Sequence, residues 1–114
     1  MELVLNGQEY SVRTEVSSLT SSIEEMLPLT LKLSRSADHE YYASLPEQAD
    51  VAGAESTSHV KAGWIYYFKD WNAFALNFKE TEIAPYKVYV IGEVSGEIEN
   101  ILEECGQNIE IKIR

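Results

Sequence analysis

The N-terminal third of the chain changes its spacing of apolar residues twice. Apolar and polar residues alternate on both sides of Asn6-Gly7, which is the strongest two-residue signal for a β-hairpin. From Ser17 onward the apolar residues recur on one helical face: Leu19, Ile23, Met26 and Leu27. A serine or threonine can cap this helix, and Pro28 ends it. Residues 29–34 alternate again and predict a half-buried strand.

Residues 35–60 have weak periodicity. They predict a short strand from Glu40 to Ser44 and otherwise one long loop rich in Ala, Gly, Ser and Thr. Loops of this length in compact domains are usually functional or mobile. We therefore expect this region to matter for function despite its plain composition.

The second half of the chain begins with an aromatic hairpin. Residues 64–68 and 74–78 alternate around a turn at 70–72, and a further strand runs from Tyr86 to Val94. In the first strand of the hairpin we expect three aromatic side chains to face the core: Trp64, Tyr66 and Phe68.

A second helix and a last strand complete the chain. Ser95 can cap this helix and Gly106 is its natural stop. Its expected apolar face consists of Ile98, Ile101, Leu102 and Cys105. Ile109 to Ile113 then alternates with charged residues, which predicts a strand.

These elements predict a mainly β fold in which each of the two helices stands alone between strands. Because the order is not a repeating βαβ pattern, we expect a mostly antiparallel sheet. About eight alternating strands are enough to close a barrel that side chains fill, with the helices at its ends or flanks. We expect residues 1–114 to form a single domain with these side chains inside the barrel: Leu29, Leu31, Leu33, Phe74, Leu76, Phe78, Ile109, Ile111 and Ile113.

Charge narrows the range of partners. The 19 acidic and 9 basic residues give a formal net charge of −10, so the long-range field repels phosphate backbones and anionic lipid. We expect no nucleic-acid partner and no membrane partner. Residues 36–60 hold five acids and no Lys or Arg, and we expect this stretch to be solvated loop. Nothing in the pattern distinguishes a monomer from an oligomer.

Cys105 is the single cysteine, so the chain cannot form an internal disulfide or a cysteine-rich metal site. Its expected place on the apolar helix face favours a small buried thiol over a reactive one. The N-terminal residues lack the basic and apolar regions of a signal peptide. We therefore expect a reducing compartment, the cytoplasm.

The polar residues form no motif that specifies a reaction. His39 lies between Asp38 and Glu40, and on a strand the imidazole would point away from both carboxylates, so we expect a solvated loop triplet. His59 adds no metal-ligand spacing, and we expect neither a metal site nor a cofactor. Ser95 lacks the flanking glycines of a nucleophile elbow, and no glycine-rich phosphate loop occurs.

Aromatic residues are the one compositional excess, and aromatics both fill barrels and line ligand grooves. Trp71 lies at an expected hairpin tip between Asp70 and Asn72, where core packing does not explain it. As candidate residues for a ligand-binding groove beside the long loop we take Arg35, Tyr41, Tyr42, Trp71 and Asn72.

Several segments together resemble a small bacterial and archaeal cyclophilin-like family whose role is unsettled. They read EMLPLTL at residues 25–31, EY at 40–41, LP at 45–46, VKAGWIYY at 60–67, and the strand from Tyr86 to Val94. The resemblance runs nearly end to end, and it implies the closed eight-stranded barrel of the peptidyl-prolyl isomerases. Fold likeness alone does not carry that activity.

The isomerase motifs that the resemblance would imply do not occur. Cyclophilin catalysis requires a Phe-His-Arg stretch on the strand after the first helix and a later Phe-x-x-Gln-x-Gly segment. The strand here reads LTLKLSR, in which only Lys32 or Arg35 could stand near the arginine's place.

Three functions remain open from the sequence. The preferred interpretation is a module that binds a peptide segment or small molecule in a groove, without efficient catalysis. The alternatives are a weak prolyl isomerase and an enzyme of unrelated chemistry whose polar groups meet only on folding. A deep, polar-lined pocket would favour the last of these.

Overall fold

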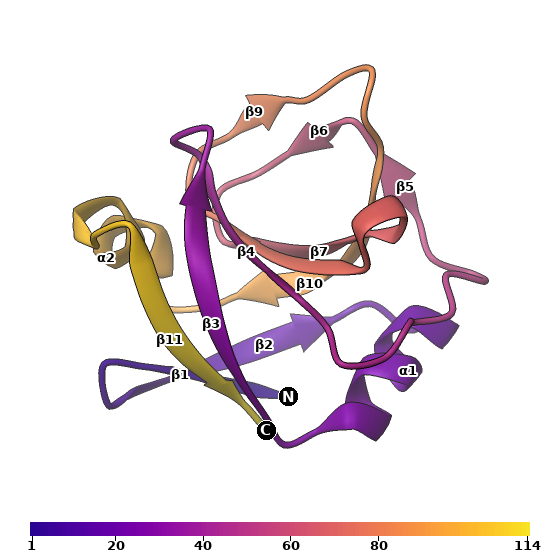
Figure 1. The fold of residues 1–114 in the computed structure, drawn as a ribbon, viewed down its shortest axis with the longest axis horizontal. Helices are drawn as coiled ribbons and strands as arrows, with labels where there is room; N and C mark the ends of the chain where they lie inside the picture. Colours follow the sequence, from indigo (N-terminus) through magenta and orange to yellow (C-terminus); the bar gives the residue numbers. More distant parts are fainter.

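Eight strands close into an antiparallel barrel in the computed structural model, which describes residues 1–114 (Figure 1). They are β1 (Glu2–Leu5), β2 (Gln8–Thr14), β3 (Leu29–Ser36), β4 (Glu40–Ser44), β7 (Trp64–Phe68), β8 (Ala73–Asn77), β10 (Val88–Val94) and β11 (Asn108–Ile113). Their order around the barrel is β2-β1-β11-β3-β4-β8-β7-β10, and β10 pairs back onto β2. The predicted fold class is confirmed.

Two α-helices and several short elements flank the barrel. The helices are α1 (Ser18–Met26) and α2 (Ile98–Glu104), and neither is long and apolar enough to cross a membrane. A 3-10 turn, η1 (Lys69–Trp71), joins β7 to β8. Three two-residue strands are too short to leave a periodic pattern, and they interrupt the expected loops: β5 (Ser56–Thr57), β6 (His59–Val60) and β9 (Thr81–Glu82).

The barrel closes where β2 and β10 pair, with Val12 opposite Val94 and Thr14 opposite Gly92. At this point β10 also has an irregular register against β7, between Val90 and Gly92. A Cβ placed on Gly92 would lie 2.3 Å from the carbonyl oxygen of Arg13. Only a residue without a side chain fits between the two main chains here.

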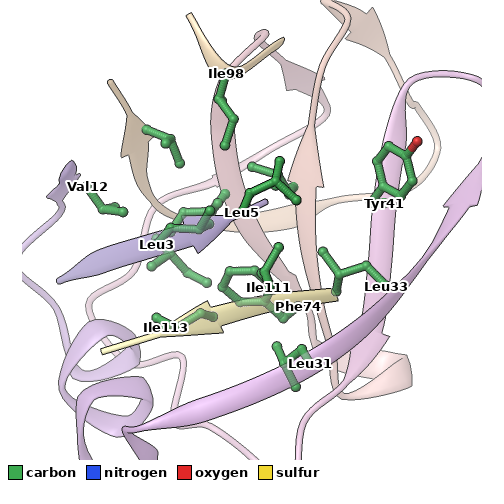
Figure 2. Close-up of a cluster of buried hydrophobic side chains, with 14 of the residues drawn as sticks. Leu3, Leu5, Val12, Leu31, Leu33, Tyr41, Phe74, Ile98, Ile111 and Ile113 are labelled. Carbon is green, nitrogen blue, oxygen red and sulfur yellow. The ribbon is translucent and has the colours of Figure 1, made fainter. Parts of the chain in front are cut away.

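The barrel interior holds one cluster of 21 buried hydrophobic residues, part of which is drawn in Figure 2. Seven of the nine predicted interior residues are buried in it: Leu31, Leu33, Phe74, Leu76, Phe78, Ile111 and Ile113. The other two, Leu29 and Ile109, are half-buried and pack against its edge. The helices add Leu19 and Ile23 from α1 and Ile98 and Leu102 from α2.

The predicted facing of β7 is wrong. Ile65 and Tyr67 belong to the barrel interior, whereas Tyr66 belongs to a second cluster with Val60, Ala75 and Val88. Trp64 and Phe68 are half-buried against this second cluster. Alternation identifies the core face only when the other face is wet, and the outer face of β7 is covered by Val60 of β6 and by Ile83 after β9.

The two helix starts differ in how well the sequence predicts them. Ser17 caps α1 as expected, with its Oγ accepting from the amide of Thr20 at 3.2 Å. Ser95 does not cap α2; its Oγ donates to the carbonyl of Ser11 at 3.0 Å. The helix begins after Gly96 and Glu97, both of which have left-handed backbone angles.

The expected apolar face and stop of α2 also need correction. Ile98 and Leu102 are buried, but Ile101 is 39% exposed, so the buried face of this short helix is narrower than expected. Gly106 does not adopt the left-handed conformation of a helix stop. The helix ends instead where the Cys105 amide donates to the Leu102 carbonyl.

Replacing Gly92 by alanine should open the barrel closure, because the new methyl group overlaps the backbone of Arg13. We expect the free energy of unfolding to fall by at least about 2 kcal/mol. Gly106→Ala is the matched control, since a Cβ there meets nothing within 4 Å; it should change stability by no more than about 0.5 kcal/mol. Urea denaturation measures both, and equal effects would show that the closure tolerates a side chain.

Candidate functional site

A cavity of about 560 Å³ lies on the outside of the barrel against β4, β8 and the loop that follows β9. Tyr41 points into the barrel, and the alternation of β4 therefore directs Glu40, Tyr42 and Ser44 outward into this cavity. Four aromatic residues line its walls: Tyr42, Phe68, Trp71 and Tyr86. Its floor contains the two buried polar residues His39 and Glu40.

The aromatic wall is a continuous series of ring contacts. The ring centroids of Phe68 and Trp71 are 5.2 Å apart, and those of Trp71 and Tyr86 are 5.8 Å apart, both in tilted or edge-on arrangements. Trp71 and Tyr86 are each more than half exposed. Large aromatic residues that line a cavity while exposed to solvent are typical of binding sites.

The turn that presents Trp71 is held from inside the barrel. Asn72 adopts a left-handed conformation with φ of 47°, and its Oδ1 accepts from the Tyr67 hydroxyl at 2.6 Å. Its Nδ2 donates to the carbonyl of Leu45 at 3.1 Å. Asn72 therefore fixes the position of Trp71 and does not itself line the cavity.

Four polar side chains form a hydrogen-bonded cluster at the cavity floor. The Tyr66 hydroxyl donates to Glu40 Oε1 at 2.6 Å and lies 3.3 Å from Asn77 Oδ1. Asn77 Nδ2 donates to the carbonyls of Lys61 and Lys79, which identifies Oδ1 as the acceptor. His39 Nδ1, 2.8 Å from that oxygen, therefore carries a proton.

Burial dominates the electrostatics of this cluster. Desolvation raises the pKa of Glu40, and the Tyr66 hydrogen bond and the nearby His39 oppose the shift in part. Burial and the adjacent carboxyl also raise the pKa of Tyr66 far above its usual value, so the phenol stays protonated and remains a donor. The site thus holds a carboxyl group that is easier to protonate than an exposed one.

One oxygen of Glu40 has no partner in the chain. Oε1 accepts from Tyr66, and His39 Nε2 lies 3.6 Å from the same Oε1, beyond hydrogen-bond distance. Every fully buried side-chain polar atom has a hydrogen-bond partner, so Oε2, which has none, is not fully buried. Because Glu40 lines the cavity, its Oε2 is reached from there.

The expectation of a solvated triplet at residues 38–40 is wrong for two of its members. His39 and Glu40 are 8% and 7% exposed, and only Asp38 faces solvent. The turn between β3 and β4 uses left-handed angles at Ala37 and Asp38, without the Gly or Asn that usually signals them. The one sequence feature that could have indicated this buried polar cluster is Asn77, a polar residue within the apolar strand 74–78.

The five predicted groove residues lie in two different places. Tyr42 and Trp71 line the cavity, whereas Arg35, Tyr41 and Asn72 do not. Tyr41 is fully buried, and its hydroxyl donates to the carbonyl of Gly106 at 2.6 Å. A ligand-binding role stays a prediction, and only Tyr42 and Trp71 of the five residues are placed for it.

Arg35 fastens α2 to the barrel. Its Nη1 donates to the carbonyl of Cys105 at 3.0 Å and to the Tyr41 hydroxyl at 3.1 Å, while Nη2 donates to Asp38 at 2.7 Å. The guanidinium also lies 4.5 Å from the ring centre of Phe78.

His59 occupies a separate, exposed cluster. Its Nε2 lies 2.5 Å from Glu80 and its Nδ1 lies 3.1 Å from Glu82, and these contacts raise the pKa of His59. The two carboxylates contact opposite ring nitrogens and so do not converge on one metal position. The arrangement joins β6 to β9 beside the second hydrophobic cluster.

The raised pKa of Glu40 predicts a pH-dependent difference between the protein and its Glu40→Gln variant. The folded state binds the Glu40 proton more tightly than the unfolded state does. The stability gained from this proton is complete below about pH 4.5 and is lost as pH rises through the folded pKa. Glutamine does not ionise, so the variant does not lose stability in this way. We expect similar stabilities near about pH 4 and a more stable variant at neutral pH, measured by urea denaturation across this range.

Glu47→Gln is the control for that experiment, because Glu47 is exposed in the loop after β4. An exposed carboxyl meets the same solvent in the folded and unfolded chains, so its replacement should leave the pH profile unchanged. A flat difference between the Glu40 variant and the protein would contradict the proposed burial of the ionisable group.

Comparison with known proteins places this geometry in a family. No curated protein matches the chain. A solution structure of a hypothetical protein from Archaeoglobus fulgidus superposes with a TM-score of 0.62 at 18% identity, covering 97% of this chain and 89% of the other. At that identity the likeness concerns the fold. The sequence model of the cyclophilin-like family matches residues 3–114, and the chain therefore belongs to the cyclophilin-like family.

Proposed function

We propose that this chain is a binding module that holds a small organic molecule in the outer cavity, without efficient catalysis. The observation that supports this most is the free Oε2 of Glu40 at the floor of an aromatic-walled cavity. Ligand sites typically combine apolar walls with a few placed polar groups in volumes of roughly 300–1,000 Å³. The cavity has both features at about 560 Å³.

Binding is a better fit than an unrelated enzymatic reaction because the polar groups are confined to one end of the cavity. His39, Tyr66 and Asn77 bond to one another or to Glu40, so they hold the carboxyl in place. The walls above them are mostly aromatic and aliphatic. Such a site orients a ligand through one polar contact and retains it by apolar packing.

The binding proposal can be tested with three phenylalkyl probes of similar size: phenethylamine, phenethyl alcohol and 3-phenylpropionate. In a titration followed by ¹H–¹⁵N correlation spectra, at least one probe should shift the Trp71 indole N–H and the amides of Glu40 and Tyr42. The indole of Trp64, which does not line the cavity, should stay in place. Trp71→Ala should weaken binding about tenfold or more, since truncating a central aromatic contact costs at least about 1.4 kcal/mol.

A short proline-containing peptide is the fourth probe in that titration. Shifts at the cavity with the peptide alone would replace the small molecule by a peptide segment as the ligand. The proposal fails if none of the four probes shifts the resonances of the cavity.

Prolyl isomerase activity should be absent. Catalysis requires groups that stabilise the twisted amide. In cyclophilins a fixed guanidinium near the prolyl nitrogen is understood to do this, and here the guanidinium of Arg35 is already bonded to Asp38, Tyr41 and the end of α2. We expect a cis-to-trans assay on a proline peptide with micromolar protein to give the uncatalysed rate. Arg35→Ala should lower the melting temperature by several degrees and leave that rate unchanged.

Arg13→Ala is the control for the stability effect, because Arg13 is exposed and makes one ion pair, with Glu93. It should shift the melting temperature much less than Arg35→Ala. Clear acceleration of isomerisation that disappears in Arg35→Ala would contradict the assignment of Arg35 to a structural role.

A further inference from the structure

The cavity holds one carboxyl group and no permanent cation. None of the eleven residues that line it is Lys or Arg, its one carboxyl is that of Glu40, and its one imidazole is that of His39. Three basic residues are adjacent in the sequence to lining residues. Arg35 is bonded to Asp38, Tyr41 and the end of α2, and Lys69 and Lys87 line a different depression that shares the rings of Phe68, Trp71 and Tyr86 with the cavity. At long range the net charge of −10 favours the approach of cations over that of anions.

The carboxyl at the floor is only weakly paired for a buried carboxylate. Glu40 is 7% exposed, its one hydrogen bond comes from the neutral Tyr66, and His39 Nε2 lies 3.6 Å from the same Oε1. Buried charges in proteins are normally paired with a charge of opposite sign. The open position is at Oε2, which is reached from the cavity, so a ligand can supply an N–H donor and a positive charge there.

The walls of the cavity suit the same kind of ligand. Aromatic rings attract cations through the negative potential of their faces, and tryptophan does so most strongly. Tyr42, Phe68, Trp71 and Tyr86 surround the space next to Glu40. Their hydrocarbon surface also packs against the apolar part of a ligand, which a hydrated metal ion does not offer.

We propose that the cavity binds a protonated organic amine that carries an apolar or aromatic group, with its ammonium against Glu40 Oε2 and its apolar part against the Trp71 wall. The proposal rests on the proposed binding function and adds the charge class of the ligand. Carboxylates and phosphates should bind more weakly, because they would face Glu40 with no lysine or arginine in the lining to receive them.

Isothermal titration calorimetry with the three matched probes tests this charge class. Phenethylamine should bind at least tenfold more tightly than phenethyl alcohol, and 3-phenylpropionate should bind most weakly. In Glu40→Gln the amine should lose at least tenfold in affinity while the alcohol changes little. Glu47→Gln, the same substitution on the exposed loop, should bind all three like the unmodified protein.

Trp71→Leu is a second variant, and it leaves the buried polar cluster around Glu40 unchanged. Because Trp71 is 58% exposed, the substitution should not disturb the core. Leucine keeps apolar contact but removes the aromatic face, so the amine should lose more affinity than the alcohol. Correlation spectra of each variant confirm that the fold is retained.

The pH dependence supplies an independent measurement. His39 and Tyr66 are the titratable groups that contact or approach Glu40, and Asn77 completes the cluster without a charge. Affinity for the amine should rise from acidic to neutral pH as the Glu40 carboxyl ionises, and Glu40→Gln should flatten most of this rise.

The outcomes separate the two proposals. Equal affinity for amine and alcohol, tighter binding of 3-phenylpropionate, or unchanged amine binding in Glu40→Gln would overturn the amine proposal and leave the binding function standing. Absence of binding by all three probes, together with the proline peptide, would overturn both.

Discussion

A closed barrel requires that every strand be paired along both edges, and in this protein the last pairing depends on one residue. Gly92 allows β10 to approach β2 so closely that a single methyl group would meet the opposite carbonyl. Once the two strands join, no barrel strand is left with an open edge, and 21 hydrophobic residues fill the interior. A filled interior leaves no room for a ligand, so the candidate site is on the outer surface.

The outer surface is shaped by a second, smaller burial. Val60 of β6 and Ile83 after β9 pack on the cluster that holds Tyr66 of β7 and Ala75 of β8, and both Tyr66 and Asn77 are fully buried. Buried polar groups are costly unless they are bonded, and each of these two is bonded. The result is a hydrogen-bonded polar floor that ends in a single unpaired oxygen of Glu40. A carboxyl that is already held in place loses less entropy when a ligand binds.

Most of the barrel could be predicted from the sequence because its strands obey a simple alternation. Leu31, Leu33, Ile111 and Ile113 face the interior as expected, since their strands have polar residues on the other side. The pattern was misleading for β7, where both faces are apolar. There, length and composition predict a strand but not its orientation.

The candidate site was harder to predict because its members are distant in the chain. Trp71 was identified because core packing does not explain it, and Tyr42 was named as a candidate groove residue. The burial of Glu40 and His39 was not predicted, because it follows a strand turn at Ala37 and Asp38 that no glycine or asparagine announces. Tyr66 and Asn77 reach Glu40 only through the register of three strands.

The strand β11 inserts between β1 and β3, so it joins the first strand of the barrel to one from its middle. Glu2 and Arg114 exchange backbone hydrogen bonds, and β1 therefore finds one of its two neighbours at the opposite end of the described residues. If β11 detaches, β1 and β3 each present an unpaired edge. A local opening at β11 would thus expose two strand edges at once, through which two copies of the chain can pair and aggregate.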